Sequence, residues 1–199
     1  MKDVLLILTG YVLGSMPWGY WLPRILTGVN IRKVGSGNTG AANVWRTLGF
    51  KIGLSVALLD VAKGLAAALL GAWLGDELVG LLAGIAAMVG HWRPLFIGFG
   101  RGGKIVATTG GVALALVPLA TLAAAAVWIV TFLATRYTSV ASLLSAATLP
   151  LFAVLFGASW PVVAFAAGAA VAIFALHRGN IARLLRRTEN RFELGRRTT

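Results

Sequence analysis

Long runs of apolar residues, separated by short polar spacers, dominate the pattern along the chain. About 20 consecutive apolar residues are needed for a helix to cross roughly 30 Å of hydrocarbon. The pattern therefore predicts an all-α integral membrane protein, a polytopic helical bundle that forms one transmembrane domain over residues 1–199. The clear candidate spans are residues 3–22, 53–75, 78–97, 138–156 and 160–176.

The run 105–134 is long for one crossing and has Pro118 near its middle. Proline removes a backbone donor and breaks a helix interior, so we expect two short crossings or a re-entrant pair. With that break, 16 of the 18 Lys and Arg residues fall on one side, all except Lys2 and Lys63. Because basic residues stay cytoplasmic, we predict about seven transmembrane helices, with the N-terminus outside and the C-terminus inside. Six spans remain possible if 105–117 inserts only halfway.

The first run resembles a signal peptide only in its hydrophobicity. It has no convincing Ala-x-Ala-like cleavage site and ends in Trp18, Tyr20 and Trp21. We expect a retained helix with these aromatic side chains at the membrane interface.

Composition narrows the class of protein. With 58% hydrophobic and 12% charged residues, the chain has too few polar side chains to cover a soluble globule. The net charge of +12 lies in the spacers and the tail, which favours anionic headgroups or phosphorylated ligands over nucleic acid. There is no cysteine and there are only two histidines, so we expect neither disulfides nor a bound metal or cofactor.

The first polar spacer, VGSGNTGAANVWRTLG at 34–49, contains Gly35, Gly37 and Gly40 in the spacing G-x-G-x-x-G. Asp60 follows twenty residues after Gly40, as in a dinucleotide-binding fingerprint. That fingerprint needs a preceding strand, whereas membrane helices flank this segment, and no Lys-Ser or Lys-Thr pair follows to make a Walker A loop. The remaining possibility is general: small residues with free backbone N–H groups wrap an anion where they enter a helix.

From Ala41 the sequence can form such a helix, with Asn43 and Arg46 three residues apart on one face. An ordinary interfacial loop, with Arg46 extended to lipid headgroups, explains the same residues equally well.

Two further segments combine similar residues. Residues 99–111, FGRGGKIVATTGG, place flexible glycines before Lys104 and Thr108. Residues 177–191 place His177, Asn180 and Arg183 at helical spacing, and Ser142 lies near the start of the sixth span. Our topology puts the loops 23–52 and 98–104 and the basic tail 177–199 on the cytoplasmic side. The arginines expected to anchor the tail to the membrane surface are Arg186, Arg187, Arg191, Arg196 and Arg197.

The segments SGNTGAANVWR (36–46), GGKIVATTGG (102–111) and HRGNIARLLRRTE (177–189) together resemble the three motifs of the bacterial acyl-phosphate:glycerol-3-phosphate acyltransferase family. They occur in the same order and with similar spacing over nearly the whole chain. The sequence departs from the family at Ile105 and Arg187, where the motifs usually have glycine.

The resemblance implies a transferase without metal or thioester donor. Such enzymes move an acyl group from a long-chain acyl phosphate to the 1-hydroxyl of glycerol 3-phosphate, giving lysophosphatidic acid and phosphate. They work at the cytoplasmic face of the bacterial plasma (inner) membrane, in phospholipid synthesis. Expected partners are therefore both substrates, membrane lipids and a soluble enzyme that produces the acyl phosphate.

By physical role we assign Lys104 and Arg46 as the main phosphate cations, since arginine binds phosphate with two parallel hydrogen bonds and lysine acts as a point charge. Glycerol phosphate is assigned to the first loop, with Asn43 as its brace. The acyl phosphate end is assigned to side chains that could stabilise an oxyanion or a departing phosphate. The residues assigned to glycerol phosphate are Ser36, Gly37, Asn38 and Gly40. The residues assigned to the acyl phosphate end are Thr108, Ser142, His177 and Asn180, and Arg183 is a further binding residue.

The general base stays open between His177 and an oxygen of a substrate phosphate. Asp60 and Lys63 are three residues apart in the second span, and we favour mutual neutralisation on one helix face over a catalytic role. His91, beside Trp92 and Arg93, is expected at the interface. Small-residue stretches at 62–75 and 165–175 predict close helix packing.

Two other classes of protein compete with an enzyme. A transporter for an anionic phosphorylated metabolite would place polar, broken helices near the midplane in two related halves, but the sequence has no internal repeat. A lipid-binding scaffold would leave three ordered motifs without a purpose.

Overall fold

The computed structural model describes residues 1–192, and in this part of the chain every regular element is a helix. The chain divides into two compact units, Met1–Pro118 and Leu119–Thr199, each with its own internal packing. The grouping of both into one catalytic domain stays a prediction. Arg196 and Arg197 of the expected tail anchor lie outside the described residues.

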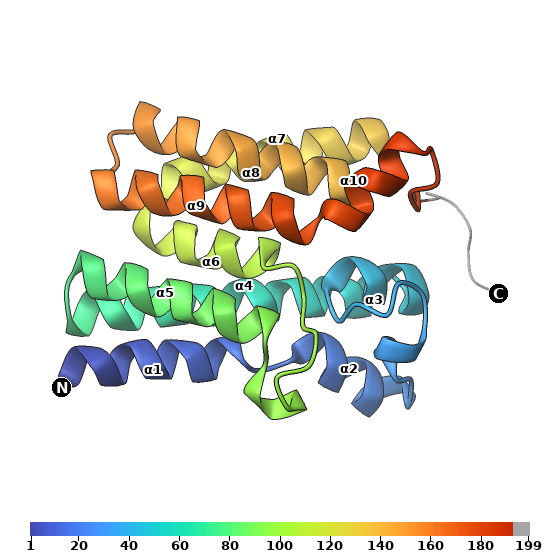
Figure 1. Cartoon of the computed structure of the whole chain (residues 1–199), viewed down its shortest axis with the longest axis horizontal. Coiled ribbons are helices and arrows are strands. Elements are labelled where there is room, and N and C mark those ends of the chain that lie inside the picture. The colour runs from blue at the N-terminus through green and yellow to red at the C-terminus, as the bar shows by residue number, and fades with distance from the viewer. Residues whose placement is uncertain (193–199) are drawn as a thin grey trace. The chain divides into compact units, whose positions relative to one another are not determined.

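The first unit is a bundle of packed helices (Figure 1). Helix α4 packs against α5 and α6, and α5 packs against α1, while the short α3 lies on α4. The elements are α1 (Lys2–Gly14), α2 (Trp18–Thr27), the 3₁₀ turn η1 (Ile31–Lys33), α3 (Ala41–Leu48), α4 (Phe50–Leu74), α5 (Glu77–Trp92), η2 (Leu95–Ile97) and α6 (Val106–Leu116).

Glycines allow these helices to approach each other closely. A Cβ atom at Gly14 would overlap the Ala87 backbone of α5, and one at Gly64 would overlap the Thr108 backbone of α6. Without a strong hydrophobic drive between helices in lipid, such close backbone contacts supply much of the packing energy. The packing predicted for 62–75 is confirmed, whereas in the second stretch Gly168 faces open space.

The first run is not the single helix that we predicted for 3–22. Helix α1 ends at Gly14 and α2 begins only at Trp18. Pro17 lacks an N–H and disfavours a helical conformation at Met16, so the chain turns there. The Met16 carbonyl accepts a hydrogen bond from the Trp18 amide at 3.1 Å. We call Ser15–Pro17 the α1/α2 junction.

The second unit contains helices that follow the break at Pro118, which is confirmed. Val117 has φ −146° and ψ 67°, outside the helical region, as expected for the residue before a proline. Helix α8 packs on α9, and Ser145 Oγ donates to the Ala124 carbonyl of α7 at 2.8 Å. The helices are α7 (Pro118–Thr135), α8 (Thr138–Leu155), α9 (Trp160–Leu176) and α10 (Arg178–Leu185).

Four helical segments among the described residues are long and apolar enough to cross a membrane, and there are five if the bent α9–α10 pair counts as one span. The α9–α10 pair bends by 59°. Helix α6 is shorter, at 11 residues, which at 1.5 Å per residue is about half a bilayer. The number seven and the orientation of the termini stay predictions. The four segments are Phe50–Leu74, Glu77–Ile97, Pro118–Thr135 and Thr138–Leu155.

Candidate active site

Asn43 holds the loop before α3 in its conformation. We call this loop, residues 34–40, the first glycine loop. Its side chain is buried at the start of α3, where Oδ1 accepts a hydrogen bond from the Ser36 amide at 2.9 Å. Its Nδ2 donates to the carbonyls of Asn38 (3.0 Å) and Val34 (3.2 Å). One amide side chain therefore satisfies several loop groups at once, which is the bracing expected of Asn43.

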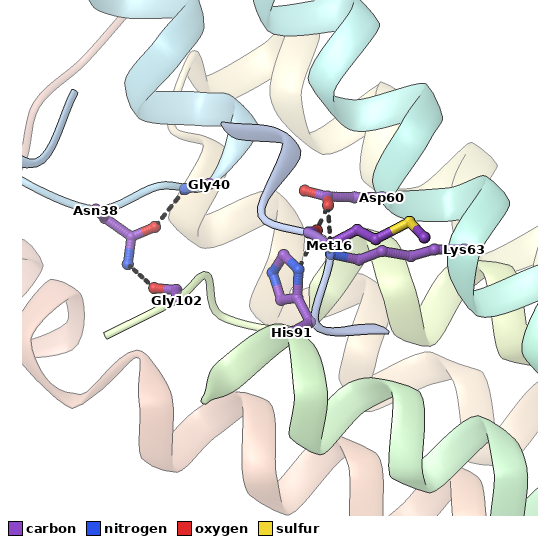
Figure 2. Close-up of polar contacts among 7 residues, drawn as sticks. All are labelled: Met16, Asn38, Gly40, Asp60, Lys63, His91 and Gly102. Carbon is purple, nitrogen blue, oxygen red and sulfur yellow. Dashed lines mark hydrogen bonds and ion pairs between the residues drawn. The ribbon is translucent and has the colours of Figure 1, made fainter. Parts of the chain in front are cut away.

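Asn38 joins the first glycine loop to a second one, residues 98–104, which we call the second glycine loop. Its Oδ1 accepts a hydrogen bond from the Gly40 amide at 2.7 Å, which fixes a tight turn before α3. Its Nδ2 donates to the Gly102 carbonyl at 3.2 Å, across 64 residues of chain (Figure 2). We assigned Asn38 to the substrate; in the structure one end of its amide closes a local turn and the other end joins the two loops.

The second loop runs back along the end of α5 and delivers Lys104. The Gly102 and Gly103 amides donate to the carbonyls of Trp92 (3.0 Å) and His91 (3.2 Å). Lys104 follows directly and is half-buried, so its position depends on these backbone bonds.

Ile105 explains why its position usually carries glycine. It has φ 59° and ψ −8°, the left-handed conformation, immediately before α6. A β-branched residue rarely adopts it, because its Cβ crowds the backbone. The turn that aims Lys104 is therefore strained, and Ile105 is otherwise held by burial, with 4% of its surface exposed.

The remaining candidates of the first unit differ in accessibility. Ser36 is exposed, and Arg46 is half-buried in the last turn of α3, where its Nε donates to the Ala42 carbonyl at 3.1 Å. Thr108 is fully buried against Gly64 of α4. Thr108 thus lies in a helix interface rather than on an accessible surface, and its substrate role remains only a prediction.

Asp60, Lys63 and His91 form a buried polar cluster beside the two loops, which we call the α4–α5 cluster (Figure 2). Lys63 Nζ lies 2.8 Å from Asp60 Oδ1, which confirms the predicted pairing. His91 Nδ1 lies 3.4 Å from the same oxygen. The interfacial position predicted for His91 is wrong: the residue is 6% exposed, because its face of α5 turns inward to Asp60.

In the second unit, His177 lies at the bend between α9 and α10 and is 4% exposed. Its Nδ1 is 2.8 Å from the Ile173 carbonyl. Since a carbonyl only accepts, this contact places the proton on Nδ1 of the neutral ring. Nε2 then carries the lone pair, as a proton acceptor requires.

Glu189 organises the side chains around Asn180. Its Oε1 accepts hydrogen bonds from Asn180 Nδ2 (2.7 Å) and Ser139 Oγ (3.0 Å), and Oε2 accepts one from Arg183 Nε (2.7 Å). Burial raises the pKa of the Glu189 carboxyl, but these donors and the Arg183 charge outweigh it and hold the pKa below its usual value. Arg183, assigned to substrate, is thus also tied to the tail.

Ser142 lies one turn after Ser139 on α8. Its Oγ accepts a hydrogen bond from Trp128 Nε1 at 3.2 Å. That bond leaves the hydroxyl proton of Ser142 available as a donor.

The predicted site residues thus fall into two groups. One gathers around the Asn38 bridge in the first unit, and the other around His177 and Glu189 in the second. Their union in a single site stays a prediction. Sequence reasoning missed the roles of Glu189 and His91, although a carboxylate among the tail arginines was a usable signal for Glu189.

The fold and its apolar helices define an all-helical integral membrane protein. The family model described as glycerol-3-phosphate acyltransferase matches residues 4–187. The chain belongs to the glycerol-3-phosphate acyltransferase family.

Relatives named glycerol-3-phosphate acyltransferase match over nearly their full length. One from Desulforudis audaxviator is 46% identical over 189 residues, covering 95% of each chain. Another from Synechococcus sp. (strain JA-3-3Ab) is 44% identical, covering 96% of this chain and 94% of its own. A similar solved structure is that of PlsY, an integral membrane glycerol 3-phosphate acyltransferase, in its glycerol 3-phosphate form. It matches with a TM-score of 0.92 and 38% sequence identity, and the match covers 97% of this chain and 96% of that chain.

Proposed function

We propose that this chain transfers a fatty acyl group from acyl phosphate to the 1-hydroxyl of glycerol 3-phosphate, giving lysophosphatidic acid and phosphate. The observation that carries the proposal is the full-length similarity to PlsY, which has been solved in a glycerol 3-phosphate form and a lysophosphatidic acid form. One form carries the acceptor and the other the product of this reaction. The acyl phosphate donor rests on the motif resemblance.

The first loop and Lys104 are proposed to hold the phosphate of the acceptor. Asn38 joins the first loop to Gly102, two residues before Lys104, and a cation beside the first loop suits a dianion. Arg46 supplies the second cation, near the end of α3. With its phosphate bound there, glycerol 3-phosphate keeps its 1-hydroxyl, at the other end of the molecule, for attack on the acyl carbon.

In the chemical step, the hydroxyl oxygen attacks the acyl carbonyl carbon and the bond from that carbon to the bridging phosphate oxygen breaks. The hydroxyl proton goes to His177 Nε2, and inorganic phosphate leaves. In a neutral ring with its proton on Nδ1, as the contact with the Ile173 carbonyl indicates, Nε2 carries the lone pair, and this supports His177 as the base. Asn180 and Ser142 are proposed to donate to the oxyanion and the departing phosphate.

We place the site at the cytoplasmic face of a bacterial inner membrane, because the basic residues of both glycine loops and the tail then obey the positive-inside rule. Glycerol 3-phosphate would arrive from the cytoplasm, and the acyl phosphate from the lipid phase or from a soluble enzyme that makes it.

The proposal is tested by giving the purified protein in lipid nanodiscs glycerol 3-phosphate and palmitoyl phosphate, and measuring lysophosphatidic acid and released phosphate. We expect equal amounts of both, and no product with palmitoyl-CoA. If no product forms while proteoliposomes show glycerol 3-phosphate flux, the protein is a transporter instead.

Lys104→Ala and Arg46→Ala should reduce kcat/KM by at least a hundredfold, since each removes a charge-assisted contact to phosphate. Lys51→Ala is the matched control, because Lys51 is an exposed cation at the start of α4. Its kinetics should stay within twofold of the wild type.

A further inference from the structure

The α4–α5 cluster is the largest group of buried ionisable side chains in the first unit that the proposed chemistry does not use. Asp60, Lys63 and His91 are 2%, 4% and 6% exposed. Ionisable groups at membrane depth are costly and need a specific reason to be there. Mutual neutralisation alone would explain the Asp60–Lys63 pair, but not the further contacts that Lys63 and His91 make.

Lys63 connects the cluster to the α1/α2 junction. Besides its ion pair, Lys63 Nζ donates a hydrogen bond to the Met16 carbonyl at 2.9 Å (Figure 2). That carbonyl is available because Pro17 interrupts the helix. The first turn of α2 follows, where a Cβ at Gly19 would overlap the Thr39 carbonyl of the first glycine loop. A shift of the junction would therefore displace that loop.

His91 connects the same cluster to the second glycine loop. The Nδ1 edge of its ring faces Asp60, and its opposite edge lies so close to Gly103 that a Cβ there would overlap Nε2. The His91 carbonyl also accepts the Gly103 amide. The contact with Asp60 orients the His91 ring, and the orientation of that ring affects the position of Gly103, the residue before Lys104.

The contacts of Lys63 and those of His91 lead to the same pair of joined loops. The first loop, reached through the α1/α2 junction, and the second loop, reached through His91, are joined by the hydrogen bond from Asn38 to the Gly102 carbonyl. The cluster therefore lies behind the two loops that the proposed function assigns to the acceptor phosphate.

We propose that Asp60, Lys63 and His91 are positioning residues, which set the two glycine loops, and with them Lys104, in the geometry that binds the phosphate of glycerol 3-phosphate. The inference rests on the proposed function. It differs from a purely structural role in one respect. A buried ion pair that only neutralises itself can be replaced by apolar side chains of similar size without loss, whereas a positioning cluster cannot.

The test is the neutral double variant Asp60→Leu/Lys63→Met, which leaves no unpaired charge in the helix. We expect it to keep a wild-type melting temperature within a few degrees while KM for glycerol 3-phosphate rises at least tenfold, with KM for palmitoyl phosphate unchanged. Amide exchange at Gly102 and Gly103 should accelerate at least tenfold, without change in the centres of α4 and α5. Ser15→Ala is the matched control: Ser15 is fully buried at the same junction and its hydroxyl has no hydrogen-bond partner among the described residues.

His91→Asn gives a second variant that keeps an N–H near Asp60 but removes the ring edge beside Gly103. It should raise the same KM, again at least tenfold. A wild-type KM for glycerol 3-phosphate in both variants overturns the inference, as does an equal loss for both substrates. Failure of the proposed function is distinguishable, because it would appear as absence of product in the wild-type protein; the exchange measurement then decides the positioning role by itself.

Discussion

The amide side chain of Asn38 spans two segments of the chain, accepting from the Gly40 amide at 2.7 Å and donating to the Gly102 carbonyl at 3.2 Å. The two bonds have separable functions, since one closes a local turn and the other fixes the distance between the two glycine loops. The substrate contact predicted for Asn38 stays a prediction.

Asn38→Asp should therefore raise KM for glycerol 3-phosphate about tenfold. The aspartate keeps an acceptor for Gly40 but places a charged oxygen against the Gly102 carbonyl, and a lost bond with such repulsion is worth roughly 1–2 kcal/mol. Steady-state kinetics measures the change, and Asn38→Ala, which loses both bonds, should be at least as impaired. A wild-type KM in both would show that the bridge does not matter for binding.

His177→Asn tests the proton acceptor. Asparagine can keep the hydrogen bond to the Ile173 carbonyl but has no basic nitrogen, so kcat should fall by about 10²–10⁴-fold with little change in KM. If kcat is retained and only KM rises, His177 binds phosphate and a substrate oxygen takes the proton.

Glu189→Gln should weaken the hydrogen bonds that hold the tail, although Glu189 itself is not proposed to contact the reacting atoms. Glutamine would direct an N–H toward donors that now reach a carboxylate, at a cost of about 1–3 kcal/mol. Because the pKa of Glu189 is lowered in the folded protein, its stabilising effect is complete above the unfolded pKa and is lost as pH falls through the lower folded pKa. Thermal unfolding from pH 7 to pH 3 should show a shallower acid destabilisation in Glu189→Gln than in the wild type; identical slopes would contradict this.

Arg187→Gly should stabilise the protein. Arg187 has φ 58° just after α10, a conformation that costs a non-glycine residue roughly 1–2 kcal/mol, partly offset by the greater unfolded-state entropy of glycine. A net gain of about 0.5 kcal/mol should raise the melting temperature by about 1–2 °C. Arg186→Gly is the matched control, because Arg186 has φ −84° and should lose stability; stabilisation by both substitutions would show that backbone strain at Arg187 is not the cause.

Local signals in the sequence identified much of this architecture. Pro118 marked a real helix break, and Ala41 the start of a real helix, because proline and glycine act on the backbone where they stand. Pro17 carried the same signal but lay inside an apolar run long enough for one span, so the run length outweighed it. The positive φ at Ile105 and Arg187 likewise explains the two places where the motifs usually have glycine.

Tertiary contacts account for what the sequence could not indicate. The spacing of Asp60 and Lys63 was enough to pair them on one helix, but nothing local places His91 beside them, since that depends on how α4 and α5 face each other. Its neighbours Trp92 and Arg93 suggested an interface instead. Glu189 is similar, because its partners Ser139 and Asn180 are 50 and 9 residues away.

Isotope labelling gives the sharpest test of the proposed acyl transfer. Glycerol 3-phosphate labelled with ¹⁸O at the 1-hydroxyl is supplied with unlabelled palmitoyl phosphate, and both products are measured by mass spectrometry. Attack by that hydroxyl on the acyl carbon predicts lysophosphatidic acid that retains the label in its ester and phosphate that carries none. Absence of lysophosphatidic acid, or label in the released phosphate, would contradict the proposed reaction.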